Sequence, residues 1–471
     1  MKKTKIICSI GPSTQKWENF KGLVDAGMNV ARINFSHATM EERKIDEELV
    51  ERANKELGTN IAILFDTKGP DLRTCTFDGD YIDLVEGETI DIVEEDVLGT
   101  QERISFNYKG ILKDLKPGMS ILVDDGFYKL VIEEASKDKV TCRIMNGGKI
   151  KSRRGVCIPG IKLDVPFVSD EDREDIKYAC EHNGDYLALS FVNCAKDIED
   201  VRALCKEYGR EDMLIISKVE TQYAMDNLDE IIDATDLVMI ARGDLGIELE
   251  IEKIPSIQKK IANAAKEAEK ICIIATEMLS TMQENPRPTR AEVSDVANAV
   301  LDGTDAVMLS SETAIGKYPV ETVTTMNKII DEIENEINYN DLLLEFSRKD
   351  KTDIPTAIAY STVDSANRIN ANAIVCSTMT GLTAKKISHF RPSAPVIAIS
   401  PIEKTVSGLT INYGIMPMKV PMLESTDEII EKSTSVAKEA LNLQKKDRIV
   451  IAGSFPLNVE YTNFLRIEEI K

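Results

Sequence analysis

Short runs of apolar residues alternate with amphipathic stretches along most of the chain. The runs are too uniformly apolar to leave one face in water, which is typical of parallel strands that are buried on both faces. Eight of them follow one another: Lys5–Ile10, Asn29–Asn34, Ile61–Phe65, Tyr186–Phe191, Met213–Ser217, Leu237–Ala241, Ile271–Ala275 and Ala306–Leu309. Amphipathic segments such as Ser256–Lys270 and Pro319–Ile337 follow most of these runs and predict helices. Eight strand–helix units predict a TIM (β/α)8 barrel, which is an α/β fold.

Between residues 71 and 166 the pattern changes to short alternating strands with glycine turns. The expected strands are Tyr81–Val85, Glu88–Val93, Ser120–Val123 and Val140–Met145. We therefore expect residues 71–166 to form a small β-rich domain that is inserted after the third barrel strand. The barrel domain is then discontinuous, with residues 1–70 and 167–341, and its size is close to the ~250 residues typical of this fold.

Residues 342–471 carry a second α/β rhythm. The expected strands are Ala373–Ser377, Pro395–Ser400, Gly414–Val420 and Arg448–Ala452, and Asp427–Leu443 is an expected helix. This pattern predicts a third, doubly wound α/β domain.

The composition of the chain indicates which classes of partner it can bind and which cellular compartment it occupies. The 58 basic and 80 acidic residues give a net charge of −22, which argues against general binding to nucleic acid or to an anionic membrane. Small phosphates remain possible ligands where a few basic groups gather. The nine cysteines are scattered and have no C-x-x-C spacing, which is typical of a reducing cytoplasm. No apolar run approaches the ~18 residues that a membrane span requires.

Polar residues follow nearly every expected barrel strand, at the end where TIM barrels carry their chemistry. They are Arg32, Asn34, Ser36, His37, Asp66, Thr67, Lys68, Arg73, Lys218, Glu220, Arg242, Asp244, Thr276, Ser310, Ser311 and Glu312. Two carboxylates with a substrate phosphate make a typical Mg²⁺ site, because this ion prefers oxygen ligands and keeps some water. A lysine beside that ion can neutralise a phosphoryl group in transit. Strand-end chemistry alone predicts a Mg²⁺-dependent barrel enzyme that acts on a phosphorylated acid.

Several of these residues also have an ordinary structural interpretation. An isolated Arg–Gly–Asp is usually a turn, and Lys218 with Glu220 fits a solvated strand end. Asp66 fits a helix cap, and His37 fits a loop position. All of these interpretations would have to hold together at one end of one barrel, which favours the functional one.

Longer segments carry a resemblance to a known family. The chain resembles pyruvate kinases from end to end, in TKIICSIGPS, AGMNVARINFSH, FDTKGPDLR, GVCIPG, ISKVE, MIARGDLGIE, NPRPTRAEVSDVANAVLDGTDAVMLS and YTNFLR. The resemblance implies a barrel with an inserted β-barrel lid domain, a C-terminal α/β regulatory domain, and a cytoplasmic homotetramer. The implied reaction is phosphoryl transfer from phosphoenolpyruvate to ADP, which gives ATP and pyruvate in the last step of glycolysis.

The resemblance also implies roles for the charged residues. Glu220 and Asp244 match the ligands of Mg²⁺ or Mn²⁺, and Lys218 matches the residue that stabilises the phosphoryl group in flight. Arg32 and Arg73 match residues that hold the phosphate. These roles agree with a reaction that depends mainly on positioning and charge neutralisation.

Substrate and nucleotide positions follow from the same resemblance. The N–H groups of Gly243 and Asp244, with the Thr276 hydroxyl, match the cradle of the substrate carboxylate. Thr276 also stands where a proton could be relayed to the enolate through water. The positions expected near ADP are Pro12, His37, Arg153 and Arg154.

A monovalent cation site is implied as well. Asn34, Ser36, Asp66 and the Thr67 carbonyl match the family's K⁺ ligands, and all four offer hard oxygen atoms. At Asp71 the family carries either an acid, which accompanies K⁺ dependence, or a lysine. The aspartate therefore favours K⁺ dependence.

Three positions depart from the family pattern. Glu277 stands where many relatives carry Gln. Ser311 replaces a Gly, and it would cost about 1 kcal/mol if that position required a positive φ. Cys157 stands where the lid usually has Asn.

The third domain contains a candidate effector loop between a strand and a helix. Its residues are Ser377, Thr378, Thr380, Gly381 and Thr383. Hydroxyl and N–H groups at a helix N-terminus can bind an anion, and in the family a sugar phosphate docks here; AMP is a second possible effector. A capped strand–helix turn explains the same residues, and the nearest basic residues are Lys385 and Lys386.

Two other functions remain open. An aldolase or lyase on the same barrel would also use two carboxylates and a metal ion, but it would need neither a lid nor a K⁺ site. A non-catalytic metabolite sensor or scaffold would be expected to lose Lys218, Glu220, Asp244 or Thr276, and the chain has kept all four.

Overall fold

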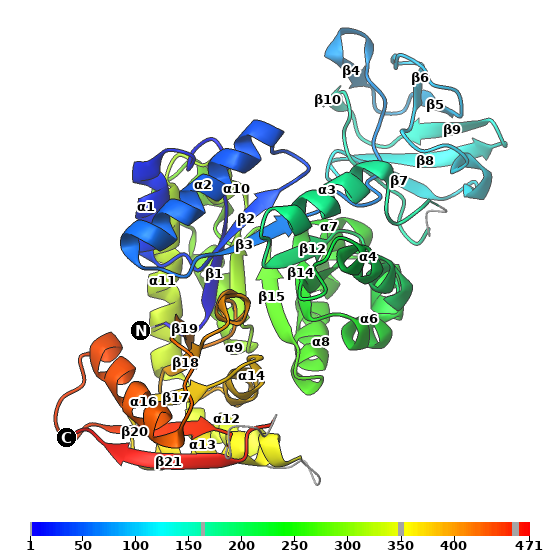
Figure 1. The fold of residues 1–471 in the computed structure, drawn as a ribbon. Coiled ribbons are helices and arrows are strands. Elements are labelled where there is room, and N and C mark those ends of the chain that lie inside the picture. The colour runs from blue at the N-terminus through cyan, green and yellow to red at the C-terminus, as the bar shows by residue number, and fades with distance from the viewer. Residues whose placement is uncertain (1, 162–164, 347–352, 455–460) are drawn as a thin grey trace.

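The structure is a computed structural model that describes residues 2–161, 165–346, 353–454 and 461–471. Figure 1 shows a central barrel, a set of β-strands at one end and an α/β layer at the other. Within the described residues, no helix combines the length and the apolar character that crossing a membrane would demand.

In the described part of the chain, eight parallel strands close into a barrel in the order β1-β16-β15-β14-β13-β12-β3-β2. Their bounds are β1 Lys5–Ser9, β2 Val30–Asn34, β3 Ala62–Asp66, β12 Tyr186–Leu189, β13 Leu214–Val219, β14 Leu237–Ala241, β15 Ile271–Ala275 and β16 Ala306–Leu309. The predicted TIM barrel is confirmed. Several strand bounds differ from the prediction by one or two residues. Two of these differences affect the site: β12 stops at Leu189, before Ser190, and β13 continues through Lys218 to Val219.

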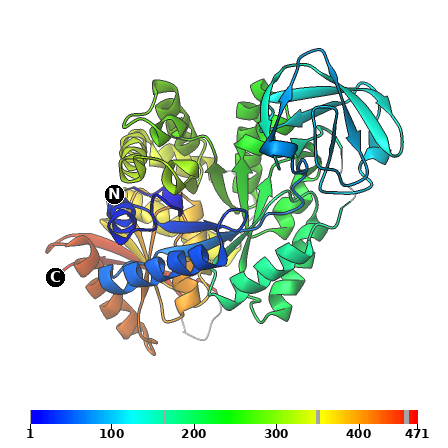
Figure 2. The ribbon, with the colours of Figure 1, turned by 90° about the horizontal axis from the view of Figure 1, so that it is seen from above.

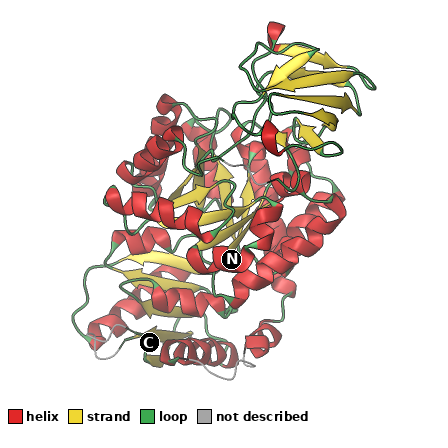
Figure 3. Cartoon of the chain, turned by 90° about the vertical axis from the view of Figure 1, so that its right-hand side faces the viewer, coloured by secondary structure: helices red, strands yellow, loops and turns green. Residues whose placement is uncertain are grey.

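Helices surround the barrel on all sides (Figure 3). They are α1 Trp17–Ala26, α2 Met40–Leu57, α3 Asp170–Glu181, α4 Ala195–Glu207, α5 Gln222–Asp226, α6 Leu228–Ala234, α7 Arg242–Glu248, α8 Ile254–Glu267, α9 Arg290–Leu301, α10 Ser311–Ala314 and α11 Pro319–Glu336, with 3₁₀ turns Ile251–Lys253 and Ser280–Gln283. Capping boxes start several of them; in α2, Thr39 accepts the Glu42 N–H and Glu42 accepts the Thr39 N–H. Because strand side chains alternate, one set packs against the helices and the other fills the barrel interior.

The inserted segment forms its own sheets around a separate core. Its strands are β4 Tyr81–Leu84, β5 Thr89–Val93, β6 Arg103–Ser105, β7 Ser120–Val123, β8 Tyr128–Ala135, β9 Lys139–Ile144, β10 Gly148–Lys151 and β11 Val156–Cys157, with 3₁₀ turns Asp78–Asp80 and Leu112–Asp114. Among its described residues, a six-stranded sheet runs β11-β7-β8-β9-β5-β6, and β10 pairs with β4 alone. Figures 1 and 2 show these sheets to one side of the barrel.

The C-terminal part is an α/β layer, as predicted. Its helices are α12 Tyr339–Phe346, α13 Ile354–Arg368, α14 Leu382–His389, α15 Glu403–Gly408 and α16 Thr426–Leu441. The strands β17 Ala373–Ser377, β18 Val396–Ser400, β19 Ile415–Lys419, β20 Arg448–Gly453 and β21 Phe464–Glu469 form a sheet in the order β19-β18-β17-β20-β21, counted over the described residues. The antiparallel edge strand β21 is absent from the predicted set, because its largely exposed sequence lacks the apolar run of a buried strand.

This C-terminal part closes the lower end of the barrel. Ile411, between α15 and β19, is fully buried in the same cluster as the barrel-interior residues Ile7 and Leu64. The Tyr186 hydroxyl on β12 donates to the Ser407 carbonyl at 3.1 Å. The amino ends of the strands are therefore sealed, which leaves the carboxyl ends as the open face.

Candidate active site

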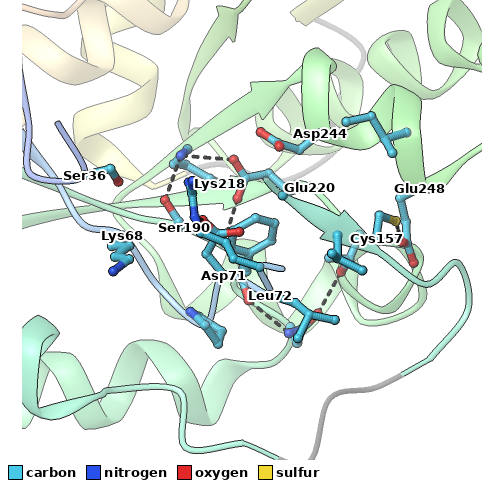
Figure 4. Close-up of a pocket in the computed structure, with 18 of the residues that line it drawn as sticks. Ser36, Lys68, Asp71, Leu72, Cys157, Ser190, Lys218, Glu220, Asp244 and Glu248 are labelled. Carbon is cyan, nitrogen blue, oxygen red and sulfur yellow. Dashed lines mark hydrogen bonds and ion pairs between the residues drawn. The ribbon is translucent and has the colours of Figure 1, made fainter. Parts of the chain in front are cut away.

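A cavity of about 530 Å³ opens at the carboxyl ends of the barrel strands, where the inserted sheets approach them (Figure 4). The barrel contributes predicted site residues from several strand ends: Arg32, Asn34, Ser36, His37, Asp66, Thr67, Lys218, Glu220 and Asp244. The inserted segment and its linkers contribute Asp71, Arg73, Arg154 and Cys157, among others. The fold thus brings most of the predicted strand-end residues into one space.

Lys218 lies at the centre of this space, as the second-last residue of strand β13. Its ammonium donates to the Ser190 hydroxyl at 2.8 Å, and it lies 3.0 Å from Glu220 Oε1 and 3.4 Å from Asp66 Oδ1. Burial would lower the pKa of Lys218, but Asp66 and Glu220 outweigh burial and raise it above the usual value. The side chain therefore stays a cation at neutral pH.

Glu220 is a carboxylate that lacks enough positive charge around it. It is 1% exposed, and Phe191 donates its N–H to Oε2 at 2.7 Å. Oε1 faces Lys218 but accepts no hydrogen bond. Burial raises the pKa of Glu220 above its usual range; Lys218 opposes this shift and Asp244 adds to it. A divalent cation beside Glu220 and Asp244 would supply the missing charge, and their oxygen atoms suit one.

Arg32 and Asp66 form a buried ion pair beside Lys218. Arg32 Nε lies 2.7 Å from Asp66 Oδ2, and Arg32 Nη1 donates to Ser9 Oγ at 2.8 Å. Burial would raise the pKa of Asp66, but Lys218 and Arg32 together lower it below the usual value. Asp66 is therefore ionised. Asp66 lines the cavity with Asn34, Ser36 and Thr67, so the four predicted K⁺ ligands share one space and all offer hard oxygen donors, the kind that suits a monovalent cation.

The residues of the predicted carboxylate cradle lie where β14 leads directly into α7 and at the end of β15. Gly243 donates its N–H to Thr276 Oγ1 at 2.8 Å, and the Thr276 hydroxyl donates to the Ala275 carbonyl at 2.6 Å. Thr276 has a φ of 66° and Glu277 one of 53°, so two non-glycine residues in a row are left-handed. Strain of this kind collects at functional sites. Asp244 lines the cavity, whereas Gly243 and Thr276 are not among the described residues that line it.

The chain matches two family models over most of its length. The model of the pyruvate kinase barrel domain matches residues 1–323, and that of the pyruvate kinase alpha/beta domain matches residues 356–468. The pyruvate kinase of Clostridium perfringens is 43% identical over 476 residues and that of Clostridium acetobutylicum 40% over 473, each covering 100% of both chains. The chain belongs to the pyruvate kinase family. A solved pyruvate kinase structure from Cryptosporidium parvum agrees, with a TM-score of 0.94, 36% identity, and coverage of 100% of this chain and 96% of its own.

Membership of the pyruvate kinase family identifies the chain as a phosphotransferase of glycolysis. The match to the family is not confined to the residues that line the cavity. The matched barrel model spans the inserted sheets as well as the barrel, and the second model spans the α/β layer.

Of the four predicted nucleotide residues, His37 and Arg154 line the cavity and Pro12 and Arg153 do not. Pro12 is exposed between β1 and α1. Arg153 has a left-handed φ of 58° and extends its side chain toward Thr76 Oγ1, at 3.3 Å. This arrangement of the inserted sheets therefore brings only two of the four positions to the cavity.

The positive charge of Arg73 affects the pKa values of both His37 and Asp71. Burial, Arg32 and Arg73 lower the pKa of His37, which favours its neutral form. Arg73 Nε lies 2.6 Å from Asp71 Oδ2. Burial raises the pKa of Asp71; Arg73 opposes this shift and Asp244 adds to it.

The predicted effector residues of this pyruvate kinase family member surround the turn between β17 and α14. Gly381 precedes α14 with a left-handed φ of 87° and donates its N–H to Thr378 Oγ1 at 2.9 Å. The Thr383 hydroxyl bonds to Thr462. Ser377 ends β17, and Thr380 is exposed in the turn. Two of the four hydroxyls are thus already engaged within the protein.

The three departures from the pyruvate kinase pattern have different consequences. Ser311 is the first residue of α10 and is not left-handed, so the expected cost of a serine there is absent. Glu277 is left-handed and exposed. Cys157 donates its thiol to Glu248 Oε2 at 2.9 Å, and burial raises the pKa of this thiol well above its usual value. The Cys157 contact joins the inserted sheets to the end of α7.

Sequence reasoning missed Ser190 and Phe191, which contact the two central charged residues. The predicted strand Tyr186–Phe191 placed both inside the barrel wall. The available signal was the single serine in this run, at the point where the other strands carry their polar residues.

Proposed function

We propose that the chain transfers the phosphoryl group of phosphoenolpyruvate to ADP, giving ATP and pyruvate. The observation that carries this proposal is the Lys218 ammonium, held between Asp66 and Glu220 at the cavity floor. Phosphoryl transfer needs positioned charge more than it needs covalent chemistry. Pyruvate kinase relatives that match the whole chain support the same reaction.

Glu220 and Asp244 would hold Mg²⁺ or Mn²⁺. The buried Glu220 oxygen without a hydrogen bond supports this assignment. The described residues contain no cluster of three or more His, Cys, Asp or Glu side chains suited to a metal ion, so substrate oxygens and water would complete the coordination. When bound, the ion neutralises charge on the transferring phosphoryl group.

Arg32 and Arg73 would bind the phosphate, and Lys218 would stabilise the phosphoryl group between donor and acceptor. The N–H groups of Gly243 and Asp244 would hold the carboxylate. Thr276 would then turn its hydroxyl away from the Ala275 carbonyl to pass a proton through water to the enolate.

K⁺ would bind Asn34, Ser36, Asp66 and the Thr67 carbonyl, with Asp71 marking K⁺ dependence. ADP would bind near Pro12, His37, Arg153 and Arg154 once the inserted sheets close over the cavity and exclude water. Residues 1–70 with 167–341, 71–166 and 342–471 would be the three domains of a cytoplasmic homotetramer. A sugar phosphate or AMP would act at Ser377, Thr378, Thr380, Gly381 and Thr383.

The first prediction tests the reaction and the role of Lys218. Pyruvate formation from phosphoenolpyruvate and ADP with Mg²⁺ should be measured with and without K⁺. Replacing Lys218→Met should lower kcat by on the order of 100- to 1,000-fold, as removal of a transition-state charge does in other enzymes. Lys21→Met is the control, because Lys21 is exposed and pairs with Asp25.

Activity that requires K⁺ and is lost in Lys218→Met would support both assignments. Activity that is indifferent to K⁺ would keep the reaction and reject the argument from Asp71. The absence of ADP-dependent pyruvate under all of these conditions would contradict the proposed reaction and favour a metal-dependent lyase.

A further inference from the structure

We propose that Ser190 is the positioning residue that aims the Lys218 ammonium; its catalytic consequence rests on the function proposed above. Ser190 directly follows β12 and is 3% exposed. Its hydroxyl lies 2.8 Å from Lys218 Nζ, a contact that Figure 4 shows. It also lies 2.7 Å from the carbonyl oxygen of Thr67, the residue that follows β3.

The direction of this hydrogen-bond chain is determined by the chemistry of its ends. An ammonium can only donate and a carbonyl can only accept. Lys218 therefore donates to Ser190. The single Ser190 hydroxyl hydrogen has two acceptors within reach, the Thr67 carbonyl at 2.7 Å and Asp66 Oδ1 at 3.4 Å, and the shorter distance assigns it to Thr67. The Ser190 hydroxyl thus accepts from the Lys218 ammonium and donates to the Thr67 carbonyl. These two contacts fix the orientation of the hydroxyl, which holds the ammonium from one side.

The end of β12 holds both central charges at once. Ser190 contacts Lys218, and the next residue, Phe191, donates its N–H to Glu220. Phe191 has a φ of 57°, which is an unusual and strained backbone conformation for an aromatic residue. This strained turn allows consecutive residues to face one cavity, whereas strand residues would alternate.

The loop after β3 packs tightly against this turn. Gly69 has a φ of 67°, and a Cβ at that position would lie 2.7 Å from the Ser190 carbonyl oxygen and 3.0 Å from Ser190 Cβ. A side chain larger than hydrogen would push Ser190 out of place. Ser190 is therefore positioned from the β3 side as well as from its own strand.

The three contacts of Lys218 are not equivalent. Those to Ser190 and Glu220 are 2.8 and 3.0 Å long, and the contact to Asp66 is 3.4 Å. The long contact is the one that a phosphoryl oxygen can replace with least loss. With Ser190 retained, the released N–H of Lys218 keeps a defined direction; without it, the ammonium can turn between the two carboxylates.

The test compares Ser190→Ala with Ser217→Ala in the full chain. Ser217 is also a buried serine, next to Lys218 in sequence, but its hydroxyl donates to Thr235 at 2.9 Å. We expect Ser190→Ala to lower kcat by about 10- to 100-fold, the range seen when a supporting contact is removed, with the KM for phosphoenolpyruvate changed less than threefold. Ser217→Ala should keep its kcat within threefold of the unmodified protein. Ser190→Thr, which restores the hydroxyl, should recover most of kcat.

A second readout does not require the reaction. The rate at which trinitrobenzenesulfonate modifies Lys218, followed by peptide mass spectrometry, should rise severalfold in Ser190→Ala, because the ammonium loses a partner that protects it. If Ser190→Ala does not fold, Ser190→Cys replaces it, since a thiol keeps the volume but accepts hydrogen bonds weakly; it should show the same changes.

A Lys218 labelling rate equal to that of the unmodified protein would overturn the positioning role, whatever the activity. Equal losses of kcat and of melting temperature in the Ser190 and Ser217 variants would also overturn it, in favour of a general structural effect. An unmodified protein that forms no pyruvate would instead contradict the proposed function, and the labelling comparison would still decide the role of Ser190.

Discussion

Asp46 is a buried carboxyl group with no cation beside it. It lies in α2, is 1% exposed, and accepts one hydrogen bond, from Gln15 at 3.0 Å, while Oδ2 has no partner in the described structure. Burial raises its pKa to about 7; Gln15 opposes this shift, and Glu42 and Glu47 add to it. The folded protein therefore holds a proton here that the unfolded chain, with a pKa of about 3.9, releases.

This difference makes stability depend on pH. Between about pH 4 and pH 7 the folded state binds more protons at Asp46 than the unfolded state does, so this residue's contribution to stability falls as pH rises through that window. Replacing Asp46→Asn removes the titration. The melting temperature of the variant, relative to the unmodified protein, should rise between pH 5 and pH 8.

Calorimetry at pH 5, 6, 7 and 8 measures this change. Asp25→Asn is the control, because Asp25 is an exposed residue that pairs with Lys21. A constant difference in melting temperature between the Asp46 variant and the unmodified protein across this range would contradict the protonated state of Asp46.

At the scale of elements, α7 and the loop after β15 act as one unit. Arg242, the first residue of α7, donates from Nη2 to the Thr276 carbonyl at 2.8 Å and pairs through Nη1 with Asp295 at 2.6 Å. The rigid fork of an arginine spans both partners, and the single ammonium of a lysine does not. Arg242 thus holds Thr276 in its left-handed conformation against Gly243.

Arg242→Lys should therefore raise the KM for phosphoenolpyruvate and lower kcat/KM by about 10- to 100-fold, as loss of a supporting contact does. Arg202→Lys is a matched control, since Arg202 also bridges a carbonyl, that of Ala234 at 3.1 Å, and a carboxylate, Asp236 at 3.0 Å. Steady-state kinetics give KM and kcat/KM for both variants and so test this prediction. Equal effects of the two substitutions would reject a specific role for Arg242.

At the scale of the whole molecule, buried charges join the C-terminal layer to the barrel. Arg391, in the loop before β18, lies 2.8 Å from Asp305 and donates to the Gly303 carbonyl at 2.8 Å. Both side chains of the pair are buried, and Ile411 fills the barrel's lower end nearby in the fold. Separation of the two parts would expose an apolar plug and an unpaired charge.

Arg391→Met should lower stability by about 3–5 kcal/mol, because it leaves Asp305 buried without its partner. Lys419→Met, which breaks an exposed pair with Glu403, should change stability by at most about 1 kcal/mol. Thermal and urea unfolding of both variants compare the two losses. A loss no larger for Arg391→Met than for Lys419→Met would show that the interface does not depend on this pair.

The sequence by itself determined the barrel and the location of its chemistry. A buried parallel strand must be apolar along its whole length, so runs such as Leu237–Ala241 and Ile271–Ala275 are visible without a structure and match the observed strands residue for residue. Polar residues directly after such runs, among them Lys218, Glu220 and Asp244, then had to meet at one face of the barrel. The family followed from long motifs that include these positions.

Only the tertiary structure decided which atoms hold the charged groups. Ser190 and Thr67 are 123 residues apart, and Arg32 and Asp66 are 34 apart, so their contacts depend on strand order and register rather than on local pattern. The left-handed turns at Phe191 and Thr276 arise from the same packing, since no local preference places an aromatic or β-branched residue there. The edge strand β21 was hidden because its position on the sheet edge leaves it exposed, and exposure removes the apolar pattern by which buried strands are recognised.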